Sequence, residues 1–158
     1  MEIMGLAIIV VLLFLGMVFV VRFIVLQPPK DHKSDYVNTE MASNIIGAML
    51  YTTAEDCSMV TFAKLFQDCA SGTNAIRCNS GAGSEISCVY AQDKVQYMLD
   101  ETLDKVNKKF HFQVKDSTRT HIEHYNTGSG GCPGEREHKE YPLPGAGNTI
   151  YVTLDICT

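Results

Sequence analysis

Residues 3–21 read IMGLAIIVVLLFLGMVFVV, nineteen consecutive residues without a charged, amide or hydroxyl side chain. A helix rises about 1.5 Å per residue, so a run of about 20 apolar residues is typical of a segment that crosses a bilayer. The rest of the chain has the mixed composition of a soluble domain. We therefore predict a long N-terminal hydrophobic helix over 1–27, a linker over 28–33 and one α+β domain over 34–158.

The apolar run differs from a cleaved secretory signal. A signal peptide has a basic N-terminal region, a short apolar core and a small-residue cleavage site. Here Glu2 is the only charged residue before the run, the run is long, and residues 25–27 (Val-Leu-Gln) are no cleavage site. We therefore expect the segment to be retained. If residue 1 begins a mature chain from which a basic leader was removed, the charges that flank the segment agree with a domain outside the cytoplasm.

Two glycines indicate a contact face on the expected helix. Gly5 and Gly16 lie eleven residues apart, or about three helical turns, and so share one side. Small residues on one side allow helices to approach closely, although glycine is also common in membrane helices in general. Arg22, near the end, can reach lipid headgroups or pair with an acid on a neighbour. The candidate assembly residues are Glu2, Gly5, Leu12, Phe14, Gly16, Phe19 and Arg22.

All the cysteines follow the apolar segment. An even number in a small domain, without any C-x-x-C pair, favours disulfides in an oxidising compartment over zinc ligation. Free buried thiols in a reducing compartment are the alternative. We expect the bridges to involve six residues, and the sequence leaves their connectivity open: Cys57, Cys69, Cys78, Cys88, Cys132 and Cys157.

Spacing restricts a few of these bridges. Cys57 and Cys69 bracket a short expected helix and lie too far apart along it to pair. Cys78 and Cys88 flank a flexible loop that would allow a local bridge. Cys157 suits a bridge that holds the C-terminal residues against fraying.

The charges near the apolar segment conflict with the cysteines. Arg22, Lys30 and Lys33 all follow the segment, and the positive-inside rule would then place the domain in the cytoplasm. Disulfides require the opposite side. Three charges are few, so we give the cysteines more weight and expect a cell-surface or extracellular domain, with the helix inserted in the membrane.

Hydrophobic periodicity predicts three further helices and three strands. The helices are expected over about 35–52, with Ser34 as N-cap, from just after Ser58 to near Gly72, and over about 89–108. Strands are expected over 110–115, 120–125 and 149–156 in an antiparallel sheet with one face on the helices. Residues 127–148, rich in Gly and Pro, are expected to form a long loop tethered by Cys132, either contacting a surface partner or passive.

We find no pattern that indicates catalysis, a cofactor or a metal. His121 and His124 should face opposite sides of a strand, which argues against shared metal ligation. Charged residues 135–140 (Glu-Arg-Glu-His-Lys-Glu) are better explained as a solvated run than as a cation site. The net charge is −5 and no basic run occurs, so nucleic acid is not an expected partner. Tyr125, Tyr141 and Tyr151 are expected to be exposed and available for an interface.

The order of an apolar N-terminal helix, a further helix and a cysteine-bridged antiparallel sheet resembles type IV pilin-like proteins. The resemblance rests on residues 1–52 and on the order of elements. It implies that N-terminal helices leave the membrane and bundle into a filament core, with the domains displayed outside. The family commonly has glutamate at the fifth position of the mature helix, where this chain has Gly5, and Glu2 is the nearest acid.

We therefore expect a structural subunit of a pilus-like filament, a homo-oligomer that passes through the membrane before it assembles. The alternative is a single-pass anchored ectodomain that binds a partner in a membrane complex. A membrane-anchored enzyme is a more distant third hypothesis.

Overall fold

The structure is a computed structural model that describes residues 2–22, 32–80, 83–128, 131–132, 134, 136–145 and 147–157. The side chains of residues 2–4, 6–7, 32–35 and 80 lie outside this description. The chain forms two compact units, Met1–His32 and Lys33–Thr158. We call the second unit the head.

In the described part of the first unit, helix α1 (Glu2–Val20) is followed by a π-helical turn at residues 21–22. The expected hydrophobic helix is therefore present over most of its predicted length. Residues 23–27, the end of that prediction, and residues 28–31 of the predicted linker lie outside the described residues.

The head is α+β, as predicted. Its described elements, in chain order, are α2 (His32–Tyr51), β1 (Thr53–Ala54), the 3-10 helix η2 (Glu55–Cys57), β2 (Val60–Thr61), α3 (Phe62–Ser71), β3 (Arg77–Ser80), β4 (Gly83–Ile86), α4 (Ser87–Thr102), the 3-10 helix η3 (Asp104–Val106), β5 (Phe110–Lys115), β6 (Thr120–Tyr125), β7 (Arg136–Pro144) and β8 (Thr149–Cys157).

The main sheet has four antiparallel strands in the order β6-β5-β8-β7. Register places Phe112 opposite Leu154 and Val114 opposite Val152, so the apolar alternation of the two central strands falls on one face. This inner face is buried, whereas the residues of β7 on the outer face are exposed. The predicted sheet with one face on the helices is confirmed.

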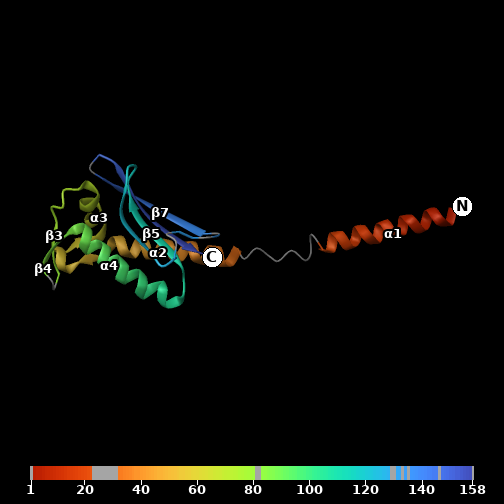
Figure 1. The fold of residues 1–158 in the computed structure, drawn as a ribbon, viewed down its shortest axis with the longest axis horizontal. Coiled ribbons are helices and arrows are strands. Elements are labelled where there is room, and N and C mark those ends of the chain that lie inside the picture. Colours follow the sequence, from red (N-terminus) through yellow and green to blue (C-terminus); the bar gives the residue numbers. More distant parts are fainter. Residues whose placement is uncertain are drawn as a thin grey trace. The chain divides into compact units, whose positions relative to one another are not determined.

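Each head helix contributes an apolar stripe to the core. In α4 the stripe is Ala91, Val95 and Leu99 at spacings of four residues, and all three are fully buried. Helix α2 lies against the sheet (Figure 1), where its Thr39 hydroxyl donates a 2.5 Å hydrogen bond to Glu137 on β7. The largest fully buried side chains include Phe66, Phe110 and Phe112.

The starts of two helices differ from the predictions. Helix α2 begins at His32, so Ser34 lies inside it and is not its N-cap. Helix α3 begins only at Phe62, which leaves Met59 outside the helix and 65% exposed. Its predicted end is confirmed, because Gly72 adopts the left-handed conformation (φ 71°) that closes a helix C-terminus.

Helix α4 ends earlier than the periodicity predicts. Asn107 has a positive φ of 55°, and the Lys108 amide turns back to the Leu103 carbonyl at 3.0 Å. Helix α4 itself ends at Thr102, so Val106, inside the predicted 89–108 helix, lies in η3 and is 56% exposed. Glu101 and Lys105 form an ion pair one turn apart on the surface, and the Lys108 ammonium donates to Asn38 at 3.1 Å.

Candidate functional site

The surface of α1 is the strongest candidate for a functional surface. Its large apolar side chains from Ile8 to Val21 are between 44% and 69% exposed. They face all directions around the helix, because the sequence has no polar side. Isolated exposed apolar residues are ordinary on protein surfaces, but a continuous apolar surface marks an interaction site.

The predicted assembly residues lie along this surface. Leu12, Phe14 and Phe19 are each more than 60% exposed. A side-chain carbon placed on Gly5 or Gly16 would meet no atom within 4 Å, so larger residues fit at both positions within this chain. The side chain of Glu2 lies outside the description, and Arg22 is exposed just after the helix.

The expectation of a membrane-spanning segment needs a correction at this point. Among the helices that the described residues form, none is both long enough and apolar enough to cross a bilayer.

The six cysteines form three disulfides, Cys57–Cys78, Cys69–Cys88 and Cys132–Cys157. Cys57 and Cys69 each pair with a distant partner, as predicted. The local bridge between Cys78 and Cys88 does not form, because these two residues pair with Cys57 and Cys69 instead. Cys157 is held by a bridge at the end of β8, as predicted. Three disulfides indicate an oxidising environment.

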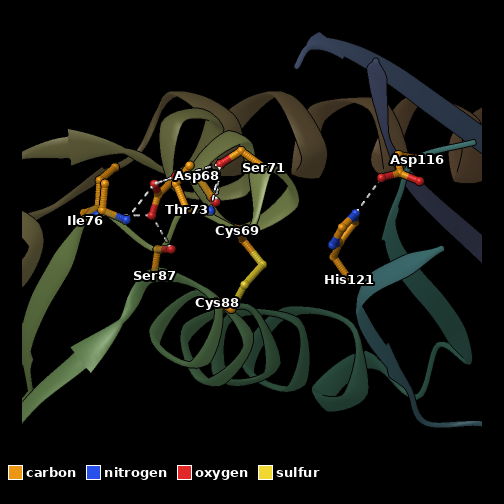
Figure 2. The surroundings of a disulfide bond; sticks show 10 residues. Asp68, Cys69, Ser71, Thr73, Ile76, Ser87, Cys88, Asp116 and His121 are labelled. Atoms are coloured by element: carbon orange, nitrogen blue, oxygen red, sulfur yellow. Dashed lines mark hydrogen bonds and ion pairs between the residues drawn. A yellow bond between two sulfur atoms is a disulfide. The ribbon is translucent and has the colours of Figure 1, made fainter. Parts of the chain in front are cut away.

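A carboxylate next to one disulfide organises this part of the head. Asp68 on α3 points toward Thr73, Ile76 and Ser87 (Figure 2). It accepts hydrogen bonds from the Ile76 amide at 3.1 Å and the Ser87 hydroxyl at 2.6 Å. Further bonds come from the Thr73 hydroxyl and the Ala75 amide. Burial opposes ionisation of Asp68, but these donors outweigh it and lower the pKa of the carboxyl group.

This cluster has a structural explanation. Asp68 precedes Cys69, and Ser87 precedes Cys88, so its hydrogen bonds hold together the two segments that carry this disulfide. All of its donors are hydroxyl groups or main-chain amides. We therefore assign the cluster to the stability of the head and not to chemistry.

Four histidines are hydrogen-bonded to carboxylates. His121 bonds Asp116 at 2.9 Å, and His124 bonds Asp100 on α4 at 2.9 Å, so the two rings face different partners as predicted. The other two pairs are His111–Glu123 and His138–Asp155. Hydrogen bonds from His111 and Gln113 lower the pKa of Glu123.

No three histidine, cysteine or acidic side chains within the described ranges are grouped so that they could hold a metal ion. Glu137 and His138 lie on opposite faces of β7, since neighbouring residues of a strand alternate. Glu135, part of the charged run, lies outside the described residues. Each of the four histidines therefore hydrogen-bonds a different carboxylate.

The predicted 127–148 loop is wrong for residues 136–144. Its residues 136–144 form the edge strand β7, which pairs with β8 along its whole length. Of the tyrosines expected at an interface, Tyr125 is exposed, Tyr151 is half-buried and Tyr141 packs against the core. Strand β7 shows no apolar alternation in the sequence, because its first five residues carry charged or histidine side chains on both faces.

Comparisons with protein families, with curated proteins and with solved structures give no match for this chain.

Proposed function

We propose that the chain is a structural subunit of a cell-surface, pilus-like filament that assembles through contacts between copies of α1. The observation that carries the proposal is the apolar surface of α1, which is exposed on every side within this chain. A helix that is apolar all round is stable when other apolar groups surround it. Identical helices from other copies would supply such groups, and lipid would cover α1 before assembly.

The energy available for assembly is large. Removing one Leu, Ile, Val, Phe or Met side chain from water contributes about 1.5–3 kcal/mol. The thirteen large apolar residues between Ile8 and Val21 are all partly exposed, so a helix bundle that covered them would dominate the free energy of association. The three disulfides suit a head that is displayed in an oxidising environment.

Electron microscopy of material sheared from cells that express the chain tests this proposal. Fibres that contain the chain are the expected result. A small discrete particle after detergent extraction, with no fibres on the cells, would instead favour a membrane-anchored ectodomain. Six free thiols under non-reducing conditions would contradict both hypotheses.

Glycine variants then test which side of α1 makes the contacts. Leucine at Gly5 or Gly16 meets no atom of its own chain, so a loss of fibres would report a contact with another copy. Gly47→Leu on α2 is the matched control, because that position is also open. Normal fibres from G5L and G16L would exclude the two glycines from the contact.

A further inference from the structure

Strand β7 forms one edge of the main sheet, and half of this edge is open for pairing. The Cys157 amide donates to the Lys109 carbonyl at 2.9 Å, which makes these opposed residues a hydrogen-bonded pair between β8 and β5. Hydrogen-bonded and non-bonded pairs alternate along antiparallel strands. Ile156 and Leu154 therefore direct their main-chain groups to β7, where Glu137 and Lys139 lie opposite them.

It follows that Arg136, His138 and Glu140 direct their N–H and C=O groups away from the sheet. All three residues are exposed, and none of these outward groups has a main-chain partner among the described residues. Pro142 and Pro144 occupy the next two outward positions and have no N–H to offer. The prolines therefore block one half of the edge and leave residues 136–140 open.

The open half is self-complementary in charge. It reads Arg-Glu-His-Lys-Glu over 136–140, so two copies that run antiparallel with His138 opposite His138 bring Arg136 opposite the partner's Glu140. The same register brings Glu137 opposite the partner's Lys139. All four pairs away from the centre then join opposite charges, and opposite charges in cross-strand pairs are stabilising.

The neighbouring registers lack this match. The two nearest shifts in register that keep the outward main-chain groups opposite each other change these pairs. One places Glu137 opposite the partner's Glu137, and the other places Lys139 opposite the partner's Lys139. The second of these shifts also places Arg136 opposite the partner's Pro142, which has no N–H. Like charges directly opposite each other are destabilising, so charge and hydrogen bonding select one register.

We propose that β7 is a pairing surface for β7 of a second copy, centred on His138 and forming about six main-chain hydrogen bonds between two heads. The contact is isologous, with the same residues on both sides. It is small, so it would be weak between isolated chains and stronger where an assembly raises the local concentration of heads. It does not depend on α1 and so goes beyond the filament proposal.

Single cysteine variants of the full chain in detergent micelles test the register. Opposed residues of a hydrogen-bonded pair lie about 5.5 Å apart between Cα atoms, a distance that a disulfide bridges. Under mild oxidation His138→Cys should give a covalent dimer on non-reducing electrophoresis. Glu137→Cys and Lys139→Cys are the controls, and each should remain largely monomeric. Equal dimer from all three variants, or more dimer from either control, would overturn the proposal.

A charge reversal and its rescue test the complementarity. Lys139→Glu sets an acid opposite the partner's Glu137 on both sides of the axis, and should weaken dimerisation about tenfold in sedimentation experiments. Adding Glu137→Lys to the same chain restores opposite charges and should restore dimerisation. Lys64→Glu, on the exposed side of α3, is the control reversal. Protection of the β8 amides from hydrogen exchange checks that each variant is folded.

The edge contact is rejected if Lys139→Glu has no effect or if the double variant is no better than the single one. Fibres without a His138→Cys dimer would reject this contact and leave the filament proposal standing. A dimer without fibres would do the reverse.

Discussion

Helices α1 and α3 lie in the same chain and have opposite environments. Helix α3 has one apolar stripe, which includes Leu65 and Phe66, and the head buries it completely. Helix α1 is apolar on every side and stays exposed within its own chain. The head therefore carries its own core, whereas α1 under the filament proposal is covered by groups from other copies. Changes in the head should alter folding, and changes in α1 should alter association.

The largest effect should come from a matched pair of phenylalanine substitutions. Phe112 is fully buried and Phe14 is 68% exposed. Phe112→Ala leaves a cavity and should destabilise the head by about 3–5 kcal/mol in denaturant unfolding. Phe14→Ala should leave the unfolding of the head unchanged and reduce fibre formation. Similar destabilisation by both variants would remove the distinction between the two regions.

The next effect concerns the disulfides, which are confined to the head. Replacing Cys57 and Cys78 with serine opens a loop of 21 residues and should cost about 3 kcal/mol, because the unfolded chain regains freedom. Thermal unfolding of the variant and of the wild type measures the change. The circular dichroism of an isolated α1 peptide in detergent is the comparison, and a reductant should not affect it.

A smaller effect should follow from Asp68→Asn. The NH2 of the new amide group would face N–H or O–H groups that now donate hydrogen bonds to the carboxylate. Some of these bonds would be lost, so the free energy of unfolding should fall by about 1–3 kcal/mol at pH 7. The folded pKa of Asp68 is lowered from 3.8, so the ionised group stabilises the head above about pH 4. This contribution is lost as the pH falls through the folded pKa. The stability difference between wild type and variant should therefore shrink in acid, and a constant difference would contradict this account.

The smallest effect concerns Tyr90, which is buried on α4. Burial, together with a 3.2 Å hydrogen bond to Asp56, raises the pKa of Tyr90 to about 12. One tyrosine should therefore titrate near pH 12 in absorbance measurements, whereas a free tyrosine titrates near pH 10. The head should lose stability as the pH rises from about 10 to 12, since the unfolded tyrosine ionises first. Tyr90→Phe should remove this late component, and its persistence would assign it to another residue.

Much of the head could be predicted from local patterns. The alternation in residues 149–156 indicated β8, and the apolar spacing in 35–52 and 89–102 indicated α2 and most of α4. Such patterns can be read from residues close together in the sequence, because each element buries one side and exposes the other. The end of α4 was not predicted, because the apolar residues continue the helical spacing past Thr102, where the chain changes to the 3-10 helix η3 and then to the left-handed Asn107.

The candidate functional surfaces also differ in whether the sequence predicts them. The composition of α1 alone indicated its apolar surface. Strand β7 could not be predicted, because its stability comes from pairing with β8 and its first residues show no apolar alternation. The disulfide partners depend on how α3 packs against the segments around it, which cysteine spacing does not reveal. The structure, and not the sequence pattern, therefore locates the edge at residues 136–140.

The position of β8 has a consequence for biosynthesis. It is the last strand in the sequence, yet it lies between β5 and β7. Strand β7 therefore cannot join the sheet until β8 has been synthesised. A chain that leaves the ribosome or crosses a membrane from its N-terminus would hold β7 unpaired until residues 149–157 emerge. The sheet therefore closes in a late step, after α1 and all the other described strands have been made.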